Sequence, residues 1–197
     1  MWAVFGVALV AITIIAFLIE FNRSPLPVIG PVRSFTLTNQ LGAAVGLASL
    51  HGSAGVANVI FSRCPTQCPK LAAQMARVQQ SMPPGARLLT LTADPGYDTP
   101  EVLARYGRTY HTDPARWWFL TGTKAEVYRL AIEDFKFNLL ESAEPAKARL
   151  EDLFIHSTDF AVFDRVGQVR AVVHGEEPDA VTRIVTLLRQ LQRESLT

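Results

Sequence analysis

The hydrophobic pattern of the chain switches several times between short apolar or alternating runs and apolar residues at helical spacing. Runs of the first kind predict strands, whereas apolar residues three to four positions apart predict amphipathic helices. The expected strands cover residues 35–38, 44–47, 56–61, 87–92, 117–120, 157–163 and 168–173. The expected helices cover residues 69–82, 99–110, 123–132 and 179–191. Strands and helices therefore alternate through the middle of the chain.

Turn residues join two pairs of these strands into hairpins. Residues 39–42 connect the first two strands, and Asp164-Arg-Val-Gly167 connects the last two. The run 56–61 is mostly apolar and is bounded by Gly55 and Pro65, which is typical of a buried central strand. Residues 135–154 are the least readable part and fit a strand followed by a charged helical or flexible insert.

The order of elements is a hairpin, a βαβ unit, a further α/β segment, a second hairpin and a closing helix. This order predicts an α/β protein with a thioredoxin-like domain, in which helices flank a central mixed sheet and a β-hairpin comes first. Within it, Thr99 is expected to cap a helix whose first residue is Pro100. Asp98 is expected to serve this turn, and Asp94 opens a turn or lies as an acidic residue near a metal loop.

The N-terminal segment has a different pattern from the rest. Residues 1–19 contain no charged side chain, and as a helix they would extend about 28 Å, close to the hydrocarbon thickness of a bilayer. No small-residue cleavage site follows, which favours an uncleaved anchor over a signal peptide. We therefore expect a transmembrane anchor over residues 1–22, a proline-rich spacer over 23–33 and the thioredoxin-like domain over 34–197.

Composition excludes several classes of protein. The 197 residues are 49% hydrophobic and 19% charged, with 19 basic and 18 acidic side chains. A net charge of +1 gives no field that favours nucleic acid, so no nucleic-acid partner is expected. Two cysteines cannot staple a disulfide-rich mini-protein, and the apolar content is too high for a disordered chain.

The two cysteines carry the most specific chemical signal. Cys64 and Cys68 lie in Cys-Pro-Thr-Gln-Cys-Pro, where the strand 56–61 gives way to the helix 69–82. Four positions near a helix start place their Cα atoms about 6 Å apart, which is within disulfide range. The helix N-terminus favours thiolates. The pair is therefore a redox-active dithiol or part of a binding site for a soft metal ion. The alternative without a function in chemistry is two inert cysteines or a structural disulfide.

A histidine could complete a metal site. The chain lacks the further ligands of a structural zinc site and the C-x-x-C-H of haem attachment, whereas two thiolates and one imidazole suit Cu(I). His156 directly precedes the strand 157–163, in the loop that thioredoxins place against their cysteines and fill with a cis-proline. We interpret the remaining histidines as surface or core residues; these are His51, His111 and His174.

Several motifs together resemble the Sco/SenC family, and the resemblance runs from about residue 27 to 191. The motifs are Phe-Ser-Arg before Cys-Pro-Thr-Gln-Cys-Pro, then Thr92-Ala-Asp-Pro95, Asp98-Thr-Pro100, Trp118-Phe-Leu-Thr-Gly122 and His156-Ser157. The resemblance implies a membrane-tethered, thioredoxin-like protein that binds copper, as Cu(I), Cu(II) or both, and helps to assemble the Cu(A) centre of cytochrome c oxidase. It implies that Cys64, Cys68 and His156 are the copper ligands.

Two functions remain open at this point. The first is a copper metallochaperone, whose partners would be the oxidase subunit that carries Cu(A) and other periplasmic copper chaperones. The second is a thiol:disulfide oxidoreductase with Cys64 and Cys68 as its redox pair, which keeps the cysteines of a partner's copper site reduced. The wider spacing than C-x-x-C and the missing cis-proline count against the second. The anchor and the resemblance favour a bacterial inner membrane protein whose domain faces the periplasm.

Overall fold

A mixed β-sheet forms the centre of the domain. In the computed structural model, which describes residues 26–194, eight strands follow the order β1-β10-β9-β4-β5-β6-β2-β3. Their bounds are β1 (Gly30–Pro31), β2 (Thr36–Asn39), β3 (Ala44–Gly46), β4 (Gly55–Ile60), β5 (Arg87–Thr92), β6 (Trp117–Thr121), β9 (Asp159–Phe163) and β10 (Gln168–His174). The sequence-based prediction of a thioredoxin-like α/β fold with a central mixed sheet and an N-terminal β2–β3 hairpin is confirmed.

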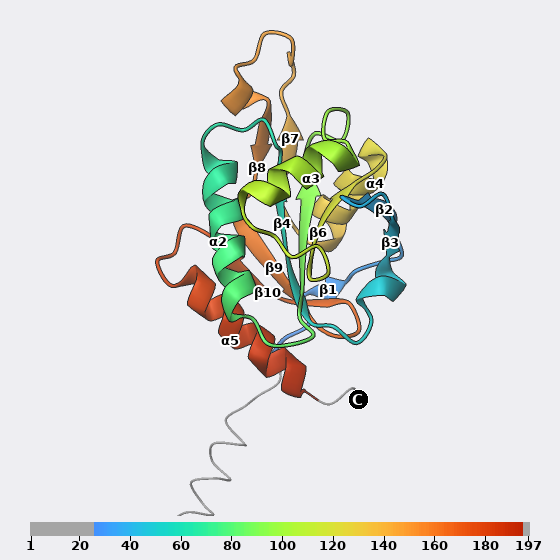
Figure 1. Ribbon diagram of the computed structural model, residues 1–197, viewed down its shortest axis with the longest axis vertical. Helices are drawn as coiled ribbons and strands as arrows, with labels where there is room; N and C mark the ends of the chain where they lie inside the picture. Colours follow the sequence, from blue (N-terminus) through green and yellow to red (C-terminus); the bar gives the residue numbers. More distant parts are fainter. Residues whose placement is uncertain (1–25, 195–197) are drawn as a thin grey trace, which may run out of the picture.

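The parallel middle of the sheet positions the cysteines. β4 pairs in parallel with β5, and β5 in parallel with β6. Helices α2 (Gln67–Ser81) and α3 (Pro100–Thr109) make the two crossovers, and both lie on the face of the sheet that is turned toward the viewer in Figure 1. Successive right-handed crossovers in one direction place their helices on the same face. Helix α5 (Ala180–Arg193) packs beside α2 on this face.

Most of the predicted elements are present within one or two residues of their expected bounds. Every residue of β4 is buried, in agreement with a central strand. The side chain of Thr99 accepts a hydrogen bond from Val102 N, and Pro100 is the first residue of α3, as predicted. Helix α2 begins two residues earlier than expected, because the turn that includes Cys68 is already helical.

The segment after β6 differs most from the prediction. The expected helix over residues 123–132 is the short α4 (Lys124–Tyr128), which continues as a π-helical segment, η2 (Arg129–Asp134). A separate two-stranded antiparallel ribbon follows, formed by β7 (Leu139–Glu141) and β8 (Phe154–His156). The predicted strand 157–163 is therefore too long, because β8 ends at His156 and β9 begins at Asp159. Short 3-10 turns, η1 (Leu47–Leu50) and η3 (Leu150–Asp152), complete the domain.

The chain enters the domain along the edge of the sheet. Gly30 and Pro31 pair with β10, so β1 lies in the segment that the sequence predicts as a spacer. Arg170 on β10 donates to the carbonyl oxygen of Leu26. The predicted transmembrane anchor over residues 1–22 lies outside the described residues. Among residues 26–194, no helix has the length and apolar character needed to cross a membrane.

Candidate metal centre

The cysteine loop leaves the carboxyl end of β4 and enters α2. Cys64 lies in this loop, where its backbone N–H donates to the carbonyl oxygen of Phe61 over 3.1 Å. Cys68 lies in the first turn of α2, and its sulfur accepts a hydrogen bond from Phe61 N at 3.4 Å. Both are free thiols, 6% and 0% exposed, respectively. The strand-to-helix junction therefore holds two shielded sulfur atoms at one end of the sheet.

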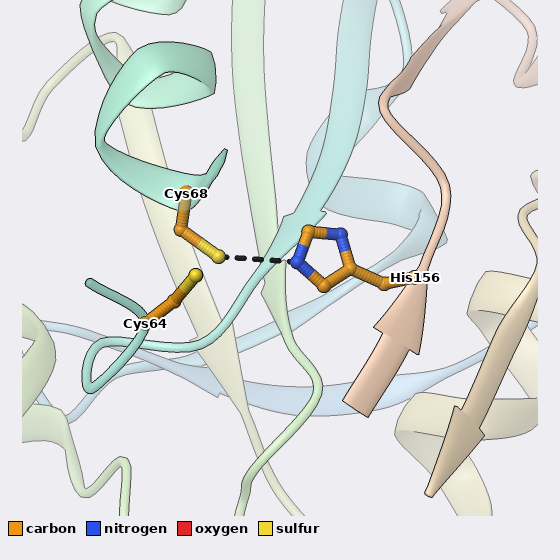
Figure 2. A group of neighbouring side chains, drawn as sticks. All are labelled: Cys64, Cys68 and His156. Carbon is orange, nitrogen blue, oxygen red and sulfur yellow. Dashed lines mark hydrogen bonds between the residues drawn. The ribbon is translucent and has the colours of Figure 1, made fainter. Parts of the chain in front are cut away.

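His156 reaches the cysteines from the other side of the site. It is the last residue of β8, and its Nε2 lies 3.1 Å from Cys68 Sγ (Figure 2). Its Nδ1 lies 3.0 Å from the carbonyl oxygen of Ser157. Because a carbonyl oxygen can only accept, Nδ1 carries the proton and Nε2 presents its lone pair to the sulfur atoms. One possible ligand atom from each of Cys64, Cys68 and His156 lies within 4.8 Å of the others.

Aromatic packing fixes the position of the histidine ring. The ring of Phe61 packs edge-on against the ring of His156, with centroids 5.8 Å apart. It also packs against the ring of Phe154, with centroids 5.0 Å apart. Phe61 and Phe154 are 1% and 7% exposed. The Phe61 backbone also bonds to Cys64 and Cys68, so this one residue joins the two halves of the site. This packing role was not predicted from the sequence, where Phe61 appears as the end of an apolar run and as the first residue of the Phe-Ser-Arg motif.

The electrostatics of the two thiols differ. Hydrogen bonding from Cys68 lowers the pKa of Cys64, and the backbone N–H groups of Cys68 and Thr66 act in the same direction. The hydrogen bond to Cys64, together with burial, raises the pKa of Cys68. Cys64 is therefore the thiolate of the pair, while Cys68 keeps its proton until a metal ion displaces it or the sulfur is oxidised to a disulfide with Cys64.

The buried carboxylate of Asp98 binds the cysteine loop through hydrogen bonds. Asp98 is 0% exposed and accepts hydrogen bonds from the backbone N–H of Ser62, at 3.1 Å, and from the hydroxyl groups of Ser62 and Thr92. Burial raises the pKa of Asp98. The sequence predicts a turn and capping residue here. That interpretation is incomplete, because Asp98 ties the loop before Cys64 to the end of β5.

Asp94 opens the turn after β5, as the simpler of its two predicted roles requires. Its carbonyl oxygen accepts from Tyr97 N and Asp98 N. Its carboxylate forms an ion pair with Arg63, whose guanidinium group lies 4.2 Å from the ring centroid of Tyr97. Asp94 therefore acts on the cysteine loop through Arg63, and it is not one of the three side chains that the described structure groups as possible metal ligands.

The remaining histidines do not join the site. The structure places His51, His111 and His174 at the surface, as the sequence analysis predicts. His174 is paired with Asp159 across the β9–β10 ladder, a contact that no sequence motif indicates.

The site can perform two kinds of chemistry. Two sulfur donors and an imidazole nitrogen form a compact, soft donor set, which fits an ion that accepts low coordination. Two neighbouring thiols with different pKa values also fit reversible disulfide formation. Together, fold and site define a thioredoxin-like protein with a dithiol–imidazole centre at the end of its central strand.

Comparison with known proteins identifies the family. The SCO1/SenC family model matches residues 30–191, so the chain belongs to the SCO1/SenC family. It is 32% identical over 150 residues to the SCO1 protein homolog of Bacillus subtilis (strain 168), a match that covers 74% of this chain and 75% of the relative.

Solved structures agree with this assignment. BsSco, described as a member of the Sco family of cytochrome c oxidase assembly proteins with a disulfide switch, superposes with a TM-score of 0.75. The two sequences are 27% identical, and the match covers 87% of this chain and all of BsSco, 100%. ScoI of Bradyrhizobium japonicum, solved with copper bound, has the same fold, with a TM-score of 0.68, 23% identity and coverage of 83% and 99% of the two chains.

Proposed function

We propose that this protein is a copper metallochaperone that binds copper through Cys64, Cys68 and His156. The convergence of these three side chains, with ligand atoms within 4.8 Å of one another, is the observation that carries the proposal. Family membership supports it, as do the description of BsSco as a cytochrome c oxidase assembly protein and the copper bound to B. japonicum ScoI. The receiving partner is the oxidase subunit that carries the Cu(A) site.

The donor set suits an ion that is carried and then released. Two thiolates favour Cu(I), and the imidazole adds a donor that Cu(II) also accepts. His156 is half-buried at the end of a short strand, whereas Cys68 is enclosed by α2 and the loop. A partner's ligands can therefore approach from the His156 side and displace the protein's ligands one at a time.

Copper titration tests the ligand set. The full chain, its thiols reduced, is titrated with Cu(I) and with Cu(II), and the same is done for His156→Ala and Cys68→Ser. We expect one copper per chain in the wild type, a weaker Cu(II) complex in His156→Ala and weaker binding of both ions in Cys68→Ser. His111→Ala is the matched control, because His111 is an exposed histidine outside the site. Equal affinities of His156→Ala and wild type for both ions would contradict the proposal.

A thiol:disulfide oxidoreductase is the second candidate. The opposite pKa shifts of Cys64 and Cys68 favour it, because they give the pair a nucleophile of low pKa and a resolving thiol that keeps its proton. An assay of disulfide reduction on a peptide with two paired cysteines, run with and without bound copper, separates the roles. Turnover by apo protein alongside failure to deliver copper would favour the oxidoreductase.

The proposal includes attachment to a membrane. We place the protein in the bacterial inner membrane, with residues 1–22 as anchor, 23–33 as spacer and the domain 34–197 facing the periplasm beside its copper-donating and copper-accepting partners. The uncharged run over residues 1–19 supports this arrangement. A C-terminal reporter fusion that is active only in the cytosol would contradict it.

A further inference from the structure

The three residues that follow His156 form a tight turn. Ser157 Oγ donates to the carboxylate of Asp159 and accepts from Asp159 N at 3.2 Å. The backbone N–H of Ser157 donates to the carbonyl oxygen of Asn138 over 2.8 Å. These bonds fix the orientation of the Ser157 peptide, whose carbonyl oxygen accepts the Nδ1 proton of His156. The direction of the imidazole ring therefore depends on this turn.

The last residue of β10, His174, and the residue that follows it, Gly175, contact this turn; we call these two residues the bridging segment. His174 Nδ1 contacts the carboxylate of Asp159, the residue directly opposite it in the β9–β10 register. The backbone N–H of Gly175 donates to the carbonyl oxygen of Thr158 over 3.1 Å. The bridging segment thus contacts both residues that come after Ser157.

The bridging segment is also tied to the cysteine helix. Gln74 lies on α2, the helix that begins with Cys68, and its Nε2 donates to the carbonyl oxygen of Gly175 over 2.6 Å. Gly175 therefore contacts α2 through its carbonyl oxygen and the turn after His156 through its N–H. One residue joins the two chain segments whose side chains must meet at the site.

The close approach at Gly175 requires glycine. A Cβ atom there would lie 2.4 Å from the carbonyl oxygen of Thr158 and 2.8 Å from Cε2 of Phe160. Both distances are shorter than real Cβ contacts, and one of the obstructing atoms belongs to the backbone. Any larger residue would push the turn after His156 away from α2.

We propose that the bridging segment, anchored to α2 by Gln74, positions His156 over the cysteines by holding the Ser157–Asp159 turn. Gln74, Asp159, His174 and Gly175 are positioning residues, since none of them contacts the three proposed ligands. The proposal rests on the assignment of His156 as a copper ligand under the proposed function. It adds that the distance between α2 and the His156 segment is set by contacts outside the ligand set.

A pair of matched variants on one helix tests the proposal. Gln74→Leu removes the tie to Gly175. Gln79→Leu removes similar ties on the same helix, where Gln79 Nε2 donates to the carbonyl oxygen of His111 and Gln79 Oε1 accepts from Asp113 N. Loss of an outer contact of a metal-ligating histidine typically lowers metal affinity by about 10-fold or more. We expect such a loss of Cu(II) affinity in Gln74→Leu and none in Gln79→Leu, at similar melting temperatures.

The bridging histidine gives an independent test. His174→Ala removes the contact with Asp159, whereas His174→Asn keeps an N–H donor near the position of Nδ1 and should restore binding. Cu(II) spectra provide the readout, because the nitrogen coupling in electron paramagnetic resonance reports on His156 while the sulfur-to-copper absorption reports on the cysteines. We expect weakened nitrogen coupling and retained sulfur absorption in His174→Ala. Gly175→Ala should show the same change more strongly.

The apo protein provides a readout that does not involve copper. Nitrogen NMR of the imidazole should show a single tautomer of His156, protonated at Nδ1, in the wild type and in Gln79→Leu. In Gln74→Leu and His174→Ala we expect averaging between tautomers. Wild-type copper spectra and a fixed tautomer in both variants would overturn the positioning role and leave the proposed function intact. A His156→Ala variant that binds both ions like wild type would overturn both.

Discussion

His156 Nε2 lies 3.1 Å from Cys68 Sγ, although 88 positions separate the two residues in the chain. The contact joins the first turn of α2 to the end of the short strand β8. Phe61, which directly follows β4, contacts both segments: its ring packs on that of His156, and its backbone N–H donates to the Cys68 sulfur. A bound ion would therefore connect two parts of the chain that only folding brings together.

Copper should raise the melting temperature of the protein. A ligand that binds only the folded state at 100 times its dissociation constant adds about 2.7 kcal/mol of stability. For a domain of this size such a gain corresponds to a rise of roughly 5–10 °C. The measurement is a thermal unfolding curve of the reduced protein with and without Cu(I). The double variant Cys64→Ser, Cys68→Ser should show no rise, and an equal rise in both proteins would count against the site.

Replacement of Asp98 should destabilise the fold and loosen the cysteine loop. Asp98→Ala leaves the buried hydroxyl of Thr92 and the N–H and hydroxyl of Ser62 without their acceptor. Each unsatisfied buried group costs about 1–3 kcal/mol, so we expect a loss of roughly 2–4 kcal/mol in the free energy of unfolding. Urea denaturation measures it. Asp113→Ala, at an exposed turn, is the control, and a similar small loss in both variants would show that Asp98 is a surface-like turn residue.

The longer helices and strands could be predicted because each is long enough for its hydrophobic pattern to repeat. Helix α2 places its buried apolar residues at Leu71, Met75 and Val78, three to four positions apart, and β4 is a continuous buried run. The cysteine pair was readable for a similar reason, since both residues lie at the junction of these two elements. The sequence thus predicted the positions of the two cysteines, because these positions depend on neighbouring elements of the chain.

The ribbon β7–β8 could not be predicted in the same way. Each strand has three residues, which is too short for a period of two to be recognised. Its outward pair, Leu140 and Ile155, is apolar yet 64% and 68% exposed, so the alternation of apolar and polar residues is absent. The placement of His156 was inferred from the fold family, and no local pattern could have set its distance to Cys68.

Asp98 and His174 show a different limit of sequence reasoning. Aspartate before Thr-Pro is common in turns, and nothing local distinguishes a solvated turn residue from a buried carboxylate that binds a distant loop. His174 lies opposite Asp159 only because the β9–β10 register puts it there. Both roles depend on tertiary contacts, which a single sequence does not display.

The His174–Asp159 pair should make stability depend on pH. The hydrogen bond and charge of Asp159 raise the pKa of His174 above 6.5, Glu177 acts in the same direction and Arg183 opposes it. A histidine whose pKa is raised on folding contributes stability that is complete below its unfolded pKa and is lost as the pH rises through its folded pKa. The stability difference between wild type and His174→Asn should therefore be largest below about pH 6.5 and shrink at higher pH.

Urea denaturation midpoints measured from about pH 5.5 to about pH 8.5 test this dependence. His111→Asn is the control, because that histidine is exposed and has no carboxylate partner among the described contacts. That variant measures the effect of replacing an exposed histidine outside the β9–β10 pair. A constant difference between wild type and His174→Asn over the whole range would show that the pair contributes no pH-dependent stability.

The two cysteines should differ in reactivity, and the difference should depend on their contact. Hydrogen bonding from Cys68 is the largest cause of the lowered pKa of Cys64, so Cys64 should be alkylated by iodoacetamide at acidic pH, where Cys68 stays protected. Cys68→Ala removes that donor. The pKa of Cys64 should then rise, and its alkylation rate at about pH 5–6 should fall while the rate at alkaline pH is retained.

Mass spectrometry of the alkylated peptides, taken over a series of pH values, measures both rates. Thr66→Ala is the control, since Thr66 contributes a weaker contact to the Cys64 sulfur and its backbone N–H is kept. That variant should shift the pH profile of Cys64 little. An unchanged profile in Cys68→Ala would mean that the backbone N–H groups at the start of α2, rather than the neighbouring thiol, hold Cys64 as the thiolate. Copper would then meet one preformed thiolate whether or not Cys68 is present, and Cys68→Ala should keep the initial binding step while losing the second sulfur ligand.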